Sequence, residues 1–149
     1  MNFSKLLKNN LKFKNKIMVK LKELINSKKV LDEFAKEKMP LMLSYKIAKV
    51  IIAVNKEHEP YVKVLNSLLE EFGTKIMVVD EKTKKEKWGG NYDLGDNVKK
   101  FNDSINELLE QDVEIAFPEI KLSDFKDINE KDMNLSPFVL SKLSWLIKE

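Results

Sequence analysis

His58 is the residue of this chain best suited to acid–base chemistry near neutral pH, because it is the only histidine and there is no cysteine. It lies between Glu57 and Glu59, and an imidazole beside carboxylates is typical of proton-transfer and metal sites. On a helix, however, adjacent residues point about 100° apart, and a zinc-protease motif needs a second histidine four residues away. We therefore interpret His58 as a half-polar residue in a helix seam. Acids from distant parts of the fold could still complete a site with it, which the sequence leaves open.

Nucleophilic, phosphate-binding and calcium-binding chemistry lack their motifs as well. None of the serines lies in a strand-to-helix elbow motif, and the glycine-rich segment 88–96 (WGGNYDLGD) lacks the GxxxxGK[ST] pattern. The segment 80–87 (DEKTKKEK) lacks the glycine and terminal glutamate of a calcium loop. We expect no enzyme activity, no catalytic residue, no cofactor and no metal.

Protein binding is better supported by the aromatic residues that stand beside the glycines. Trp88 and Tyr92 are the kind of side chains that anchor protein interfaces, and lysines precede them. The predicted partner-binding residues are Trp88, Tyr92, Lys84, Lys85 and Lys87. A second interpretation stays open for Trp88, which could instead cover the core beneath its own loop.

The positive charge is concentrated at the N-terminus. All 27 basic residues are lysine, and residues 1–29 hold nine of them with the single acid Glu23, a net charge of +8. Such an arm could bind nucleic acid, an anionic membrane surface or an acidic partner. The absence of arginine argues against sequence-specific base recognition. The arm lysines predicted to bind nucleic acid, as the alternative function, are Lys5, Lys8, Lys12, Lys14 and Lys16.

Apolar spacing predicts a long helix over 42–72. Its stripe has spacings of four and three, as in a coiled coil, and Pro60 is expected to bend the helix without ending it. Pro40 precedes the helix and Gly73 follows it as a helix stop. The stripe residues are Ile47, Ile51, Val54, His58, Tyr61, Leu65, Leu68 and Phe72.

Shorter elements flank this helix. Alternation predicts strands at 17–22 and 113–117, and Asn26 or Ser27 is expected to cap a helix to about residue 38. The segment 76–88 predicts a β-hairpin or a mobile loop, and a helix over 97–110 should pack on the long helix. Ser136-Pro137 begins a last helix that reaches Ile147. The expected fold is α+β: a long antiparallel helical hairpin with a β-hairpin or loop excursion, flanking short strands and a C-terminal helix.

The predicted organisation is a basic N-terminal extension over 1–17, which could be disordered, and a single α+β domain over 18–149. Met18 would make a natural start, and residues 1–17 lack the features of a signal peptide. No apolar run approaches the roughly 18 residues that a membrane-spanning helix needs. We expect a cytoplasmic protein of a bacterial host cell, which could also be associated with a virion.

The order of these features is similar to that of a protein family. It consists of the segment LKELINSKKVLDEFAKEKMPLMLSYKIAKVIIAVNKEHEPYVKVLNSLLEEFG, then NVKKFNDSINELLEQDVEI, then LSPFVLSKLSWLI. Over about residues 19–149 the chain resembles small uncharacterised proteins of tailed phages and prophages of low-GC bacteria. The resemblance implies a non-catalytic accessory protein that binds a phage or host protein or associates with itself. Its role would be in virion assembly, or as an inhibitor of a bacterial protein such as a defence nuclease.

Overall fold

The computed structural model describes residues 14–148 and has the α+β fold that the sequence predicts. The described residues form two compact units, unit 1 (14–58 and 111–148) and unit 2 (59–110). Helix α3 (Leu41–Phe72) contributes to both units and continues through Pro60. The region predicted as one domain therefore comprises two compact units. The boundary expected after residue 17 falls inside a strand.

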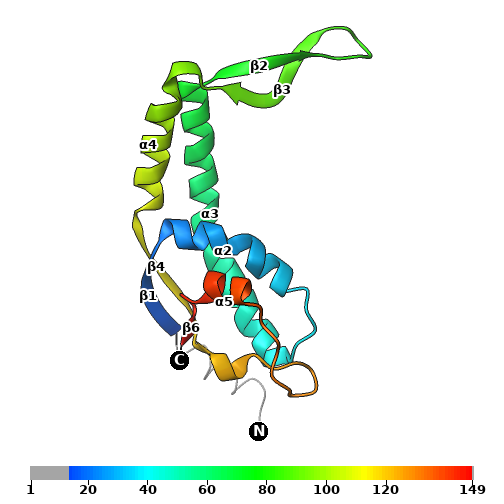
Figure 1. Ribbon diagram of the computed structural model, residues 1–149, viewed down its shortest axis with the longest axis vertical. Coiled ribbons are helices and arrows are strands. Elements are labelled where there is room, and N and C mark those ends of the chain that lie inside the picture. Colours follow the sequence, from blue (N-terminus) through cyan, green and yellow to red (C-terminus); the bar gives the residue numbers. More distant parts are fainter. Residues whose placement is uncertain (1–13, 149) are drawn as a thin grey trace. The chain divides into compact units, whose positions relative to one another are not determined.

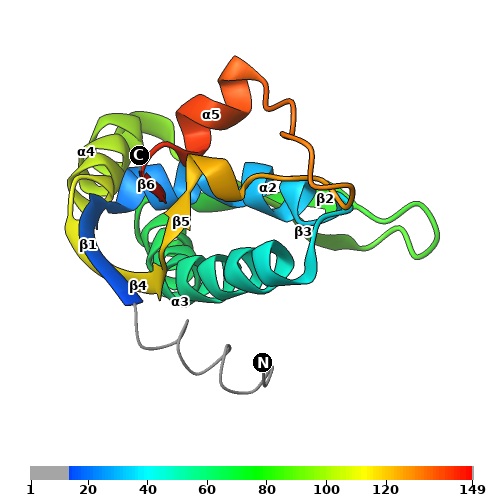
Figure 2. The same ribbon diagram turned by 90° about the horizontal axis from the view of Figure 1, so that it is seen from below.

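Unit 1 is built from short strands and helices around the first part of α3. Two strand pairs hold it together: β1 is antiparallel to β4, from Lys14↔Pro118 to Lys20↔Asp112, and β5 is parallel to β6. Figure 2 shows α2 between α5 and α3. The elements are β1 (Lys14–Lys20), α2 (Leu21–Phe34), β4 (Asp112–Pro118), β5 (Ile120–Lys121), η2 (Leu122–Asp124), α5 (Pro137–Leu143) and β6 (Ile147–Lys148).

The core of unit 1 follows from the apolar periodicity of these elements. Apolar residues at helical spacing on α2 and α3 meet the alternating inward residues of β4. Two ring contacts extend the core, between Phe34 and Phe125 (5.6 Å) and between Phe117 and Trp145 (5.8 Å, edge-on). The buried apolar residues are Val19, Leu21, Leu24, Val30, Leu31, Phe34, Leu43, Ile47, Val50, Val54, Ile115, Phe117, Ile120, Phe125, Leu143 and Leu146.

Unit 2 consists of a helical hairpin that ends in a two-stranded ribbon. Helix α4 runs back beside the second part of α3, and the ribbon extends from the end where the two helices are joined (Figure 1). The Asn97 side-chain amide donates to the Phe72 carbonyl (2.9 Å), which ties the start of α4 to the end of α3. The elements after α3 are β2 (Thr74–Val79), β3 (Glu86–Asp93), η1 (Gly95–Asn97) and α4 (Val98–Leu109).

Gly73 ends α3 for a steric reason. A Cβ at this position would lie 2.7 Å from the Leu69 carbonyl oxygen and 2.9 Å from Tyr92 Cβ. The Gly73 N–H donates to that same carbonyl (2.9 Å), so the chain leaves the helix where only glycine fits. The predicted helix stop is confirmed.

Several predicted boundaries in unit 1 were wrong, among them the end of the helix expected at about residue 38, which lies at Phe34. The first strand ends at Lys20 rather than 22, and α2 begins at Leu21, so Ser27 is buried inside the helix and donates to the Leu24 carbonyl (3.0 Å) instead of capping. The last helix begins as predicted, with Ser136 Oγ accepting from the Val139 N–H (3.2 Å). It ends at Leu143, because residue Ile147 pairs with β5. Among residues 14–148, no helix has the length and apolarity required to span a membrane.

Candidate protein-binding surface

The ribbon of β2 and β3 is set up by its turn. The Asp80 carboxylate accepts hydrogen bonds from the N–H groups of Lys82 (2.8 Å) and Thr83 (3.4 Å), and the Asp80 N–H donates to the Lys85 carbonyl (2.9 Å). Lys84 adopts a positive φ of 54°, the left-handed conformation that closes four-residue hairpin loops. A short, hydrogen-bonded turn thus brings the two strands together.

The pKa of the Asp80 carboxyl is lowered by the hydrogen bonds that it accepts. The hydrogen bonds from the backbone of Lys82 and Thr83 lower its pKa below the ordinary value of 3.8, and the hydrogen bond from the Lys87 ammonium acts in the same direction. Lys87 Nζ lies 3.4 Å from the carboxylate. One ionised side chain therefore fastens both the turn and the beginning of β3.

Trp88 stands opposite Met77 in the ribbon, and its side chain is held by contacts with Asn91, Tyr92 and Lys75. The indole N–H donates to the Asn91 carbonyl (2.9 Å). The Tyr92 ring meets it edge-on, with ring centres 5.2 Å apart, and Lys75 Nζ lies 4.8 Å from its ring centre. These contacts fix the indole in one orientation although its side chain is 42% exposed.

The glycines after Trp88 shape β3. The strand register shifts between Lys75 and Met77, so β3 carries a bulge opposite this point. Gly90 has a φ of 92°, and a Cβ at Gly89 would lie 2.9 Å from Val78 Cγ1. The sequence WGG therefore bends one strand and leaves β2 regular.

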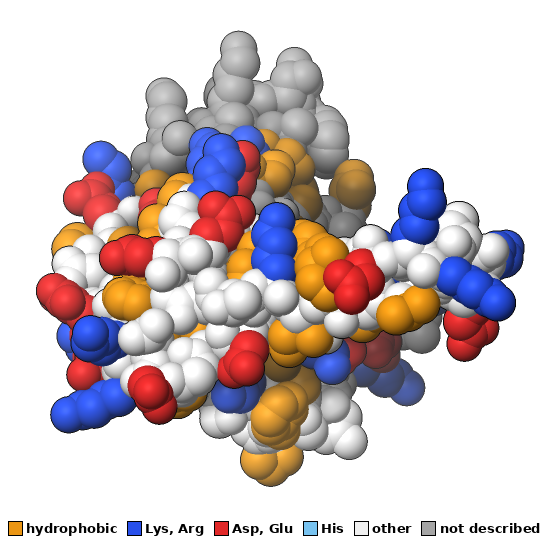
Figure 3. All heavy atoms as spheres, turned by 90° about the horizontal axis from the view of Figure 1, so that it is seen from above, with side chains coloured by type: hydrophobic (Ala, Val, Ile, Leu, Met, Phe, Trp, Pro, Cys, Tyr) orange, Lys and Arg blue, Asp and Glu red, His pale blue; other side chains and the backbone are white. Residues whose placement is uncertain are grey.

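Both faces of the ribbon carry exposed apolar side chains. Met77 and Val79 share the face of Trp88, while Ile76 and Val78 point to the other face, and Val79 is 63% exposed. Figure 3 shows hydrophobic side chains along the ribbon and lysines toward its free end. An exposed apolar patch of this kind is typical of an interaction site.

All five predicted partner-binding residues lie on this ribbon. Trp88 and Tyr92 touch each other, Lys87 pairs with Asp80, and Lys84 and Lys85 belong to the turn. The interpretation of Trp88 as a cover for the core is wrong, because the ribbon carries it among exposed residues. Of the arm lysines, Lys14 and Lys16 belong to β1 in unit 1. Lys5, Lys8 and Lys12 lie outside the described residues.

The ribbon also contains residues that the sequence interpretation missed. The apolar run Ile76–Val79 was recognised as a strand but not as part of the surface, and Lys75 and Asp80 were not considered. The sequence does contain a signal. Four consecutive apolar residues lie between charged ones, without the apolar–polar alternation that predicts one buried and one exposed strand face. Such a run in a two-stranded hairpin leaves apolar side chains on both faces.

His58 lies on α3, with Glu57 and Glu59 adjacent to it in the helix. Glu59 forms an ion pair with Lys63 one turn later (3.6 Å). Within residues 14–148, no three histidine or acidic side chains are grouped closely enough to hold a metal ion.

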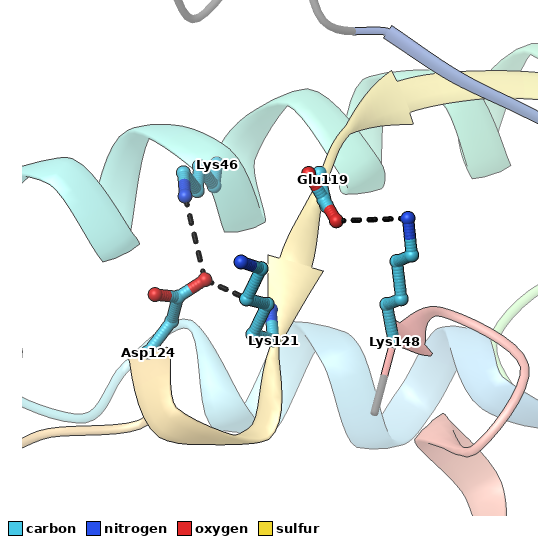
Figure 4. Close-up of polar contacts among 5 residues, drawn as sticks. All are labelled: Lys46, Glu119, Lys121, Asp124 and Lys148. Carbon is cyan, nitrogen blue, oxygen red and sulfur yellow. Dashed lines mark hydrogen bonds and ion pairs between the residues drawn. The ribbon is translucent and has the colours of Figure 1, made fainter.

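Unit 1 contains an open hollow of about 810 Å³ between β5, η2 and α5. The ion pairs of this region fasten elements of the unit to one another (Figure 4). Asp124 pairs with Lys46 of α3 (3.4 Å) and accepts from the Lys121 N–H (2.8 Å), while Glu119 pairs with Lys148 (3.1 Å). The hollow is lined by Lys121, Leu122, Ser123, Phe125, Lys126, Asp132, Met133, Asn134, Leu135, Leu140 and Lys148.

Comparison with known proteins adds no information about this surface. No protein-family model, no curated protein and no solved structure matches the chain significantly.

Proposed function

We propose that this chain is a non-catalytic protein-binding protein of the phage or prophage type, acting in the cytoplasm of a bacterial host. Its role is that of an accessory in virion assembly or of an inhibitor of a bacterial protein such as a defence nuclease. The observation that carries the proposal is the β2–β3 ribbon, with four consecutive exposed apolar residues opposite an ordered, exposed Trp88.

The charge of the ribbon favours a protein over a nucleic acid. Residues 74–93 hold five lysines and four acids, a net charge of only +1. Affinity for a phosphate backbone rests on lysines and arginines that are not neutralised by neighbouring acids. Apolar surface on both faces is instead what the centre of a protein interface uses.

The contacts of the Trp88 side chain within the ribbon favour its role as an interface anchor. Its three fixed contacts remove side-chain freedom before binding, so less entropy is lost when a partner covers it. Tryptophan is enriched among residues that dominate interface energies, at 2 kcal/mol or more each.

Strand β2 offers a second element of recognition. Because the Asp80 N–H points to β3, the alternate residues Met77 and Val79 direct their N–H and C=O groups away from it. This edge is free of proline and bulges, and it can accept an added strand from a partner. We therefore assign backbone pairing to the edge of β2 and side-chain anchoring to Trp88.

A photo-crosslinking residue placed at Val79 tests the proposal. In a lysate of a low-GC host, with and without phage infection, we expect one protein to be captured from this position. A crosslinker at Met18 in unit 1, which is equally exposed, should not capture it. The Trp88→Ala variant should weaken binding of the captured protein by about 30-fold or more.

A matched control variant separates anchoring from general loss of apolar surface. Phe138 in unit 1 is an exposed aromatic residue with Lys142 Nζ 5.6 Å from its ring centre, much like Trp88 with Lys75. Phe138→Ala should leave binding unchanged. Equal capture at Val79 and Met18, or equal binding by the two alanine variants, would refute the proposal.

The alternative function, nucleic-acid binding by the N-terminal arm, rests on the net charge of +8 in residues 1–29. Its test should keep β1 intact, so glutamine replaces Lys5, Lys8, Lys12, Lys14 and Lys16 in the full chain. Binding of duplex DNA should weaken with salt, with a slope of about −0.9 per phosphate contact, and the variant should lose it. DNA retention that the five substitutions leave unchanged would exclude the arm.

A further inference from the structure

Lys75 lies over the proposed anchor residue of the ribbon. Its ammonium is 4.8 Å from the centre of the Trp88 ring, a distance typical of a cation–π contact. Because Lys75 belongs to β2 and Trp88 to β3, the lysine side chain reaches from one strand toward the other. Lys75 is also paired across the strands with Tyr92, whose ring meets the indole edge-on. The ammonium and the two aromatic rings therefore form one cluster, on the face of the ribbon that carries Met77 and Val79.

The ammonium of this cluster has no acidic partner within the described part of the chain. Among residues 14–148, no carboxylate forms an ion pair with Lys75. On the opposite face of the ribbon, by contrast, Lys87 is paired with Asp80 (3.4 Å). The Trp88 face does carry an acid, Glu86, but it stands opposite Val79, four positions along β2 from Lys75. This face thus has an unpaired cation at one end and an acid toward the turn.

A partner that covers Trp88 must also cover the Lys75 ammonium. Interface anchors are shielded from water, and a charge that loses water without gaining a partner is costly to bury. A carboxylate supplied by the partner would replace the lost water and balance the charge, in surroundings where the attraction is stronger than in water. A basic side chain at the same point would be repelled. The cluster therefore favours a partner with an acid close to the apolar group that contacts the indole.

The open edge of β2 indicates the form of the segment that carries this acid. Among the described strands, β2 pairs with β3 alone, so its other edge is available. Four consecutive apolar residues, Ile76–Val79, follow Lys75 along this edge. Residues of an added strand would stand directly opposite those of β2, with Cβ atoms about 4.5–5.5 Å apart. Apolar residues should therefore lie opposite Ile76–Val79 and an acid opposite Lys75.

We propose that the ribbon binds an extended segment of its partner in which a run of apolar residues is flanked at one end by an acid. The carboxylate lies against Lys75, and the apolar side chains cover Met77, Val79 and Trp88. Glu86 disfavours a second acid at the other end, so charge determines which way the segment lies along β2. This inference rests on the proposed function, because it names the kind of segment that the protein-binding surface accepts.

Selection from a displayed library of random peptides on the immobilised full chain tests the inference. Peptides that bind the wild type but not the Trp88→Ala variant should contain an apolar run with aspartate or glutamate at one end. For a synthetic peptide of this kind, Lys75→Glu should raise the dissociation constant roughly tenfold or more, because like charges then face each other. Replacing the acid of the peptide by lysine should restore binding to the Lys75→Glu chain, because the charge pair is then reversed.

Lys142 provides the matched control, because its ammonium lies over the exposed ring of Phe138 in unit 1. Lys142→Glu makes the same change of charge and should leave the peptide affinity unchanged. Trp88-dependent peptides without an acid, or a Lys75→Glu chain that binds the acidic and the lysine peptide equally, would overturn this inference alone. A library that yields no Trp88-dependent peptide would also overturn it, while crosslinking from Val79 still decides the proposed function separately.

Discussion

Pro60 lies inside α3, where most residues donate their N–H to the carbonyl four residues earlier. Proline has no N–H for the Lys56 carbonyl, and its ring crowds that carbonyl. Pro60→Ala should restore one backbone hydrogen bond, which contributes about 0.5–1.5 kcal/mol, and also relieve the crowding. The unfolded chain gains freedom at the same time, which offsets about 0.4–1 kcal/mol. Proline is about 3 kcal/mol worse than alanine in a helix interior, but α3 already continues through Pro60, so we expect a smaller net stabilisation of about 1–2 kcal/mol.

The assay is thermal unfolding followed by circular dichroism at one protein concentration, with hydrogen exchange of the segment 56–66 measured in parallel. For a chain of this size the melting temperature should rise by about 2–8 °C. Amides one turn on either side of residue 60 should exchange more slowly, because the hydrogen-bond ladder of α3 becomes continuous.

Pro40 provides the matched control in the same helix. It precedes Leu41, and its carbonyl accepts from the Ser44 N–H (3.0 Å), so it stands at the N-cap, where an N–H has no helical acceptor. Pro40→Ala should only increase the conformational freedom of the unfolded chain, which destabilises the folded protein by about 0.4–1 kcal/mol. The two substitutions should therefore change the free energy of unfolding in opposite directions. A Pro60→Ala variant that is no more stable than the wild type would show that α3 already compensates for the missing bond.

The remaining predictions concern the ribbon turn and the core. The Asp80 carboxyl should titrate below 3.8 by NMR, because its folded pKa is lowered; the turn should be intact above the unfolded pKa and lose protection as pH falls through the folded value, and Asp80→Asn should abolish this dependence. Lys84→Gly should stabilise the ribbon by up to about 1 kcal/mol, seen as slower exchange of the Val78 amide, because glycine accepts the positive φ without strain. Leu24→Ala, at a position with no exposure, should cost about 2–5 kcal/mol in chemical denaturation. Leu65→Ala, on the half-buried hairpin, should cost less than about 2 kcal/mol.

Local signals in the sequence predicted the elements that depend on local physics. The alternating spacing of three and four along α3 predicted its length to within a residue, because Pro40 and Gly73 act on the backbone next to them. The Ser136 cap and the hairpin of β2 and β3 were predicted on the same basis. For the candidate surface, an aromatic residue beside glycines was enough to locate Trp88.

Boundaries set by distant partners could not be predicted in this way. Strand β1 extends back to Lys14 because β4 offers it seven paired positions, and nothing near Lys14 indicates that partner. Helix α5 stops at Leu143 because Ile147 pairs with Ile120, again far away in the chain.

Periodicity also does not predict how deeply each part of an apolar stripe is buried. The α3 stripe runs without a break from Ile47 to Phe72, yet Ile47 and Val54 are buried in unit 1 while Leu65 stays half-buried in unit 2. The stripe predicts which side of the helix faces inward. It does not predict that the part of the stripe in unit 2 stays half-buried.

The pairing of β1 with β4 also sets the order of events during synthesis. Strand β1 ends at Lys20 and β4 begins at Asp112, so α2, the whole of α3 and the rest of unit 2 lie between the two strands in the chain. At translation rates of about 5–20 residues per second, β1 waits on the order of 5–20 s for its partner strand to leave the ribosome. During that interval its hydrogen-bonding edge is unpaired, while α2, α3 and the ribbon can form from contacts close in sequence. The first strand to emerge is thus among the last to be completed, and the nascent chain is most vulnerable to mispairing and to chaperone capture at β1.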